Sequence, residues 1–425
     1  MSYESLAARF APAFDEVGQG EVARESGRHL PFAAFEMLRA QGLGTLSVPV
    51  GSGGAGAGQE DTYRLLMDLA AEDANTAHLV RSHLSFVQHV LAQPDPAVRE
   101  RWLGRIVAGE VAGSALSEGR GTALGDVGTT VCQDETGQLL ISGSKYYTTG
   151  SIFSTWALAT ARLDPGLSRS HRRRHKGFAL AVVRVRQPRV TVKDDWDGFG
   201  QRLTGTGTME FSGAGVEDLL VVPPEDGAVP LHHESTLMAL LAGIGRAALR
   251  DGVAQTRLRR RSPNTGGGLT PRDDDQLLGI VGELSAQQAA VEELVRAAGR
   301  DLDAALALAA MAPDGALEGA GAGVGHQAEE HDGGAAAEAM HRAALTAHRA
   351  HVMVPRLVLD TCTRIFDTLG ASATSTDLRL DRHWRNARTV ASHDPAAFMA
   401  RMVGDWEVNG TRPVPYLSTG AAGTG

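Results

Sequence analysis

The densest group of chemically capable side chains lies near the carboxyl end of the chain. It comprises residues 381–389 (DRHWRNART) and the His393-Asp394-Pro395 that follows. Two imidazoles, an indole and several charges stand there in a region otherwise rich in Ala and Leu. A helix surface used only for solubility needs neither Trp nor His. Because imidazole titrates near neutral pH, histidine can donate or accept a proton at working pH. This segment is therefore the first candidate for catalytic residues.

Composition narrows the class of protein. The chain has 425 residues, 43% hydrophobic and 21% charged, as in soluble globular proteins of two or three structural units. A net charge of −9 argues against binding to nucleic acid or an anionic membrane. The first twenty residues carry several charges and lack the apolar core of a signal peptide. Two cysteines without metal-ligand spacing indicate a reducing compartment. We expect a cytoplasmic protein with no nucleic-acid, membrane or metal partner.

The periodicity of apolar residues predicts three successive regions. Residues 1–112 show helical spacing, residues 113–231 contain short strands separated by turn signals, and residues 232–425 are helical again. The strands suggest a small antiparallel barrel or sandwich. Long helices are expected at 237–260, 273–311 and 335–369, with Gly-rich linkers at 262–268 and 312–334.

This order, with four motifs in sequence, resembles the acyl-CoA dehydrogenase superfamily. The motifs are residues 42–49 (GLGTLSVP), 68–73 (DLAAED), 114–118 (SALSE) and 143–151 (GSKYYTTGS). The resemblance covers nearly the whole chain and implies an α+β, acyl-CoA dehydrogenase-like fold. That fold has an N-terminal helical domain, a small central antiparallel β-barrel or sandwich, and a C-terminal four-helix bundle.

Within the superfamily, the chain is most similar to flavin-dependent monooxygenases of the dibenzothiophene monooxygenase and sulfur-acquisition type. Residues 194–202 (DDWDGFGQR), 370–375 (GASATS) and 381–395 carry this similarity. It implies a homotetramer that receives reduced FMN from a separate flavin reductase and uses O₂ as co-substrate.

Two departures argue against a dehydrogenase. Such an enzyme needs a carboxylate base, usually Glu, where this chain has His393-Asp394-Pro395. Asp is one methylene shorter than Glu, and Pro fixes the backbone. The Arg-x-x-Phe-Gly segment that holds the FAD pyrophosphate in the family is also missing, since Arg257 leads instead into Pro263 and three glycines. FMN is therefore expected, with FAD as the alternative.

Several residues are candidates for managing a C4a-hydroperoxyflavin, which needs a closed pocket and few well-placed donors. His393 is the first, with Asp394 beside it, and His83 lies on the helix whose family counterpart borders the pocket. The alternative for His393 is a helix-end histidine bonded to a carbonyl, and for His83 it is packing. Thr148, Thr149 and Ser151 stand where the family runs a strand past the isoalloxazine ring.

Flavin binding suggests a second set of candidates. Ser117 is expected at the pyrimidine edge or the phosphate, where Ser372, Arg385 and Arg388 are further candidates because arginine binds phosphate in a bidentate way. Alternatively, Arg385 and its neighbours form a structural ion-pair network. Trp196 in the 194–202 segment is expected to be a packing anchor. The basic residues 171–175 are expected to be a solvated hairpin tip, or else a site for an anionic substrate or the reductase.

The sequence therefore predicts a two-component monooxygenase that uses reduced FMN and O₂ to oxygenate a small, largely apolar molecule. Sulfur is the first expected target, followed by amine nitrogen and aromatic carbon. Two alternatives stay open: an acyl-CoA dehydrogenase-like FAD oxidoreductase, and an inactive flavin-binding or scaffold protein.

Overall fold

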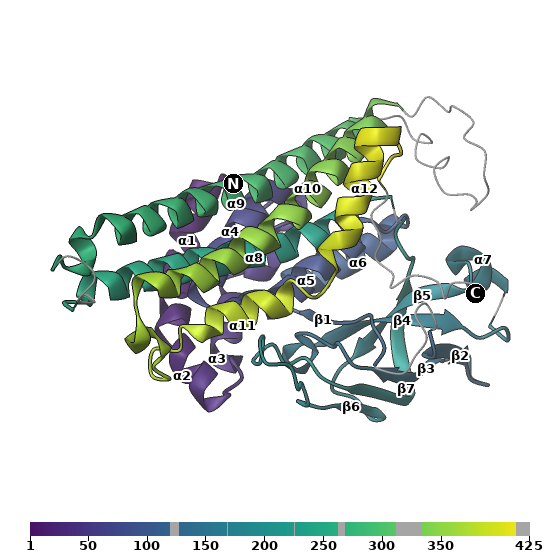
Figure 1. The fold of residues 1–425 in the computed structure, drawn as a ribbon. Helices are drawn as coiled ribbons and strands as arrows, with labels where there is room; N and C mark the ends of the chain where they lie inside the picture. The colour runs from purple at the N-terminus through teal and green to yellow at the C-terminus, as the bar shows by residue number, and fades with distance from the viewer. Residues whose placement is uncertain (120–126, 168, 225, 262–267, 312–333, 414–425) are drawn as a thin grey trace, which may run out of the picture.

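The computed structural model describes residues 1–119, 127–167, 169–224, 226–261, 268–311 and 334–413. Helices, a small barrel of strands and further helices follow one another in the order that the sequence predicts (Figure 1). Most of the linkers predicted at 262–268 and 312–334 lies outside the described residues.

The N-terminal part is helical, as expected. Its helices are α1 (Tyr3–Gln19), α2 (Glu21–Gly27), α3 (Phe32–Ala40), α4 (Gln59–Glu72), α5 (Ala74–Leu91) and α6 (Pro96–Val107), with 3₁₀ turns at Leu43–Thr45 and Val50–Ser52. Asp73 separates α4 from α5 and caps α5, because its carboxylate accepts the backbone N–H groups of Asn75 (2.9 Å) and Thr76 (3.1 Å). Every residue of α5 except Leu91 is buried.

The central strands close into a barrel. They are β1 (Ala112–Ala115), β2 (Thr130–Gln133), β3 (Leu139–Lys145), β4 (Trp156–Leu163), β5 (Phe178–Arg184), β6 (Val190–Val192) and β7 (Met209–Leu220). Pairing runs β4–β5–β7–β3–β2 and returns to β4, while β1 also pairs with β4 and β6 with β7. The barrel is mainly antiparallel, as the sequence predicts, with two parallel pairs among the described strands. β1 and β2 occupy successive halves of one edge of β4, and both run parallel to it.

The basic residues 171–175 were expected at a hairpin tip, but they belong to a short helix, α7 (Arg169–His175). No Gly or Pro interrupts this stretch, and Arg is a good helix former. One of its side chains, Arg174, forms an ion pair of 2.9 Å with Asp95 at the start of α6.

The C-terminal part is built on three long helices that lie side by side (Figure 1). Its helices are α8 (Ala228–Leu258), α9 (Asp275–Met311), α10 (Ala335–Arg364), α11 (Asp381–Val390) and α12 (Ala396–Asn409), with 3₁₀ turns at Pro271–Asp273, Ile365–Thr368 and Ala371–Thr374. Helix α4 packs against α8 and α9. None of the described helices has the length and apolar character that crossing a membrane requires.

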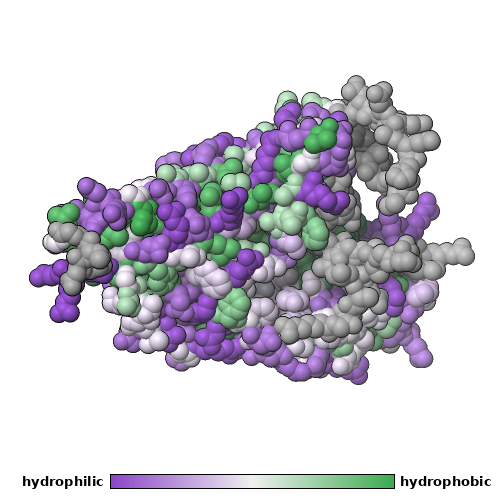
Figure 2. Space-filling model, in the orientation of Figure 1, coloured by the Kyte–Doolittle hydropathy of each residue, from purple (hydrophilic) through white to green (hydrophobic). Residues whose placement is uncertain are grey.

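Three apolar cores position the site. One joins α1, α4, α5, α8 and α10, and a second fills the barrel. The third joins α5 and α6 to the outer face of the barrel, where Phe86, Trp102, Trp156 and Leu158 meet. The first four residues of β4 face the third and second cores in turn, so this end of the strand is buried on both faces. On the face shown in Figure 2, hydrophilic residues predominate, with small apolar patches between them.

Candidate active site

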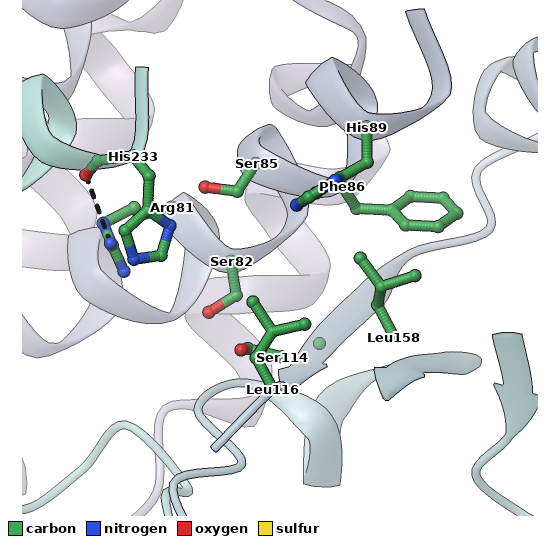
Figure 3. A pocket seen from close by; sticks show the side chains of 10 residues that line it. Arg81, Ser82, Ser85, Phe86, His89, Ser114, Leu116, Leu158 and His233 are labelled. Atoms are coloured by element: carbon green, nitrogen blue, oxygen red, sulfur yellow. Dashed lines mark hydrogen bonds between the residues drawn. The ribbon is translucent and has the colours of Figure 1, made fainter. Parts of the chain in front are cut away.

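A cavity lies where the middle of α5 faces β1 and the first turns of α8. Figure 3 shows Arg81 and His233 on one side of it, Phe86 and Leu158 on the other, and Ser82 and Ser85 between them. The remaining lining residues are His89, Gly113, Ser114 and Leu116. The cavity therefore has a polar end formed by α5 and α8 and an apolar end against the barrel.

Several polar atoms in the cavity wall have no hydrogen-bond partner in the described part of the chain. They are the hydroxyls of Ser82 and Ser85 and the Nδ1 atoms of His89 and His233. Burial lowers the pKa of His89 to about 4, so its ring is neutral at neutral pH. Buried polar atoms are nearly always paired in folded proteins. Unpaired ones gathered on one cavity indicate a place for a ligand.

Arg81 carries the only charge in this wall. Its side chain is 3% exposed, with Nε donating to Thr236 Oγ1 (3.1 Å) and Nη2 to the His233 carbonyl oxygen (3.3 Å; Figure 3). Burial lowers the pKa of Arg81 to about 10, with Asp394 opposing that shift. The guanidinium is therefore still charged at neutral pH. Among the described residues, no carboxylate reaches ion-pair distance from it.

His393 and Asp394 do not line this cavity, but His393 lies next to His233 at its polar end. The His393 ring lies 5.6 Å from the His233 ring, and its Nδ1 is 3.1 Å from Asp394 Oδ2. Burial raises the pKa of Asp394, but the hydrogen bond and the charges of His393, His351 and Arg81 outweigh it and lower that pKa overall. The side chain of His393 is 42% exposed, so it stands between the cavity and the surface.

A buried cluster lies behind this pair. His351 Nδ1 is 2.9 Å from Glu234, and its Nε2 is 3.1 Å from the backbone oxygen of Asp394. Both partners only accept, so both ring nitrogens must carry hydrogen and His351 is an imidazolium. Burial alone lowers the pKa of His351, but Glu234 raises it overall. Glu234 also pairs with His348 at 3.0 Å. Among the described residues, no three His, Cys, Asp or Glu side chains are arranged to hold a metal.

His83 is placed differently from the expectation. It does not line the cavity, and its Nδ1 accepts the backbone N–H of Ala112 in β1 (3.1 Å). Burial lowers the pKa of His83 to about 4. A Cβ added to Gly44 would lie 2.7 Å from the same ring. The imidazole thus joins α5 to β1 and to the Leu43–Thr45 turn.

Thr148, Thr149 and Ser151 lie on a loop packed behind β1. The Thr149 carbonyl accepts the N–H of Ser114 (3.0 Å), and Ser151 Oγ donates to the Ser114 carbonyl (2.9 Å). Thr148 Oγ1 donates to the carbonyl of Gly207, and Thr149 Oγ1 bonds Thr206. The loop therefore adjoins the strand that lines the cavity without lining the cavity itself.

The remaining cofactor candidates lie elsewhere. The Ser117 carbonyl, just beyond β1, accepts the N–H of Tyr146 (3.3 Å). Ser372 is exposed in the Ala371–Thr374 turn. Arg388 donates to Ser392 Oγ and to the carbonyl of Ala391 at the end of α11. None of these three lines the cavity.

The charges of α11 form ion pairs with distant parts of the chain. Arg385 binds Glu25 (2.8 Å), Asp381 (2.8 Å) and the carbonyl of Phe199 (2.9 Å). Arg382 binds Glu21 and Asp251. The ion-pair network that the sequence allowed for this helix is therefore present in the structure.

The 194–202 segment is anchored by its own polar side chains. Asp194 pairs with Arg28 (2.9 Å), and Asp195 accepts the N–H of Thr208 (2.7 Å). The Trp196 indole donates to the carbonyl of Gly200 (2.9 Å). Trp196 is thus fixed within the segment, as expected of a packing anchor.

Sequence reasoning missed Arg81, Ser82, Ser85 and His233. A signal was available, because Arg81, Ser82, Ser85 and His89 recur at helical spacing and so share one face of the helix. Such a polar stripe on a helix buried all round has no solvent to face. It therefore faces a cavity or another polar group.

Family models match successive parts of the chain. The acyl-CoA dehydrogenase N-terminal domain matches residues 6–110, the middle domain 114–214 and the C-terminal domain 303–397. The chain belongs to the acyl-CoA dehydrogenase family. The helical, barrel and helical parts described above correspond to these three domains of the family in order.

Relatives within the acyl-CoA dehydrogenase family cover nearly all of the chain. The probable FMNH2-dependent monooxygenase SfnC of Pseudomonas putida is 28% identical over 94% of both chains. The structure of methanesulfinate monooxygenase MsuC from Pseudomonas fluorescens is 26% identical, covers 96% of this chain and 98% of its own, and has a TM-score of 0.81. FMN-bound TdsC from Paenibacillus sp. A11-2 is 26% identical, covers 95% and 98%, and has a TM-score of 0.79.

Proposed function

We propose that this protein is a monooxygenase that uses reduced FMN and O₂ to oxygenate a small molecule, with sulfur as the first target. The observation that carries the proposal is the cavity with unpartnered polar atoms, next to which His393 packs against the lining residue His233. The similarity to SfnC, MsuC and FMN-bound TdsC supports the cofactor and the sulfur target.

The cavity wall is chemically suited to FMN. A flavin ring presents nitrogens and carbonyl oxygens that need donors and acceptors, and the free hydroxyls of Ser82 and Ser85 offer both. We propose that the β1 side holds the flavin through Ser114 and Ser117, with Thr148, Thr149 and Ser151 supporting that strand. When bound, reduced FMN supplies two electrons to O₂, so that one oxygen atom enters the substrate and the other leaves as water.

His393 and Asp394 are proposed to handle protons. His393 holds a proton at the edge of the cavity, and Asp394 orients its ring through the 3.1 Å contact. His83, whose Nδ1 is used by β1, is proposed to position that strand. For Arg385 we propose a structural part, because Glu25, Asp381 and Phe199 already occupy its donors. Binding of the phosphate by Ser372 and Arg388 stays a prediction.

A partner protein and an oligomeric state are proposed with this activity. A separate flavin reductase supplies the reduced FMN, and the protein is a homotetramer. Light scattering during gel filtration measures the second point directly, and a mass near four times 44.7 kDa is expected.

The test is an oxygenation assay. The purified protein is mixed with FMN, NADH, a generic flavin reductase and ¹⁸O₂, and sulfur compounds, amines and phenols are offered in turn. We expect one ¹⁸O atom in a sulfur product, formed only when both the protein and the reductase are present.

Two results would replace this proposal with one of the alternatives. Tightly bound FAD that an acyl-CoA reduces would identify a dehydrogenase-like oxidoreductase. Failure to bind FMN in either redox state, measured by fluorescence titration, would identify a scaffold protein.

A further inference from the structure

Arg81 is a buried cation without an anionic partner. Two of its nitrogens donate to neutral oxygens, on Thr236 and on the His233 backbone, and no bond to Nη1 is made by the described residues. The side chain is 3% exposed and lines the cavity. Burying a charge without a counter-charge is strongly unfavourable, so proteins rarely keep one without a use for it.

The surroundings of Arg81 leave the charge uncompensated. Burial, with a smaller effect of Arg81 itself, lowers the pKa of His78 to about 3 and that of His232 to about 3. The same causes hold the pKa of His233 well below its usual value. These rings are therefore neutral and add no charge. Asp394 acts on Arg81 only at longer range, since its carboxylate is bonded to His393.

The far end of the cavity is largely apolar. Phe86 and Leu158 line it opposite Arg81 and His233, and the His89 ring beside Phe86 is neutral (Figure 3). A ligand that satisfies both ends has a negatively charged head and a compact apolar body.

We propose that Arg81 binds the head group of an anionic substrate, and that the substrate is a small organic oxyanion such as a sulfinate, sulfonate or carboxylate. This inference rests on the proposed function and names its substrate class. A guanidinium forms paired, charge-assisted hydrogen bonds to such oxygens. The charged head would lie at the α5 and α8 end, near His393, and the apolar body would extend toward Phe86 and Leu158, beside the flavin on the β1 side.

The experiment measures binding without flavin, so that it does not depend on turnover. Isothermal titration compares benzenesulfinate and benzoate with methyl phenyl sulfoxide, a neutral compound of similar shape. The variants are Arg81→Met, which removes the charge, and Arg81→Lys, which keeps the charge but loses the planar pair of donors. Arg401→Met, on the exposed face of α12, is the matched control for net charge.

The wild type is expected to bind at least one anion more than tenfold tighter than the sulfoxide. Loss of the charge-assisted bonds in Arg81→Met is expected to weaken anion binding roughly 10- to 100-fold. Arg81→Lys should lie between, and binding of the sulfoxide should change little. Arg401→Met should match the wild type.

Three outcomes would overturn the inference. In the first, the wild type binds the sulfoxide as tightly as both anions. In the second, Arg81→Met keeps full anion affinity. In the third, Arg81→Met loses FMN affinity instead, which would assign the arginine to the cofactor. If Arg81→Met does not fold, the inference is still tested by the affinities of the wild type for the anions and the sulfoxide, and by the anion affinity of Arg81→Lys. Anion binding without any oxygenation would sink the proposed function and leave the anion site standing.

Discussion

At the scale of residues, His393 is the group that the structure leaves most free to act. Its Nδ1 contacts Asp394, its ring faces His233, and 42% of its side chain is exposed. A group with so few structural contacts can be removed with little cost in stability. Its substitution should therefore affect chemistry far more than folding.

His393→Ala is expected to keep its melting temperature within a few degrees of the wild type and to uncouple the reaction. NADH and O₂ would still be consumed, but hydrogen peroxide would replace most of the oxygenated product. A peroxide assay run beside product quantification measures this. His29→Ala, an exposed histidine near the end of α2, is the control and should stay coupled. A His393→Ala protein that remains fully coupled would remove His393 from the mechanism.

The Glu234–His351 pair gives stability a defined pH dependence. The pKa of His351 is raised in the folded protein. Its contribution to the free energy of unfolding is therefore complete below the ordinary histidine pKa of 6.5, and it is lost as pH rises through the higher folded pKa. Burial opposes ionisation of Glu234, but His348 and His351 lower its pKa below the ordinary 4.5, so its contribution is lost only as pH falls through that lower value.

Glu234→Gln is therefore expected to destabilise the protein most between about pH 4.5 and 6.5, and less above the folded pKa of His351. Breaking a buried pair costs about 3–5 kcal/mol. Unfolding by denaturant at pH 6 and pH 9 measures the difference. An equal loss at both pH values would show that His351 is not charged in the folded protein.

At the scale of elements, the 194–202 segment and α11 are held together by backbone contact. A Cβ added to Gly200 would lie only 2.1 Å from the Arg385 carbonyl oxygen, so this position requires glycine. Gln201 N–H donates to Asn386 Oδ1 at 2.7 Å, and Phe199 stacks on Trp384. These contacts explain why two of the three segments that carry the closer family resemblance, 194–202 and 381–395, lie together in the fold.

Gly200→Ala is expected to destabilise the protein by about 1–3 kcal/mol, because the added methyl group must displace backbone. Gly404→Ala is the matched control. It lies exposed within α12 with nothing within 4 Å of an added Cβ. That variant should be more stable by about 0.5–1 kcal/mol from helix propensity alone. Chemical denaturation measures the free energy of unfolding of both variants. Equal changes in the two would rule out the close approach of Gly200 to the Arg385 backbone.

Element by element, the sequence predicted α9 and α10 within a few residues, because their apolar periodicity and Gly-rich ends are local signals. Helix α8 begins at Ala228, well before the predicted start at residue 237. Apolar periodicity could not show which face of α5 meets the cavity, because every residue of that helix except Leu91 is buried. The only signal for that face was the helical spacing of Arg81, Ser82, Ser85 and His89. The ion pair of Arg385 with Glu25 could not be predicted either, because Glu25 lies 360 residues away in the chain and such a contact leaves no local pattern.

At the scale of the whole molecule, a buried ion-pair cluster joins the two ends of the chain. Arg382 in α11 binds Glu21 in α2 at 2.6 Å and Asp251 in α8 at 2.7 Å, and His383 binds the same Asp251 at 2.9 Å. The Arg382 and Glu21 side chains are 5% and 8% exposed. Three elements from distant parts of the sequence are thus fastened at one point.

Arg382→Met is expected to cost about 3–5 kcal/mol, because it leaves the carboxylate of Glu21 buried without its partner. A large fall in the denaturation midpoint measures this, with Arg401→Met as the control expected within about 0.5 kcal/mol of the wild type. If both variants unfold alike, the cluster does not hold the chain ends together.

The burial of α5 has a consequence for changing the enzyme's selectivity by engineering. A residue on this helix touches either the cavity or a core, so a library that randomises α5 would mostly yield unfolded proteins. The opposite wall carries Leu116 and Ser114, which are only half-buried and lie at the end of a short strand. Laboratory evolution toward bulkier compounds should therefore start from Leu116 and from the residues around His393, and leave Ser114 to the flavin.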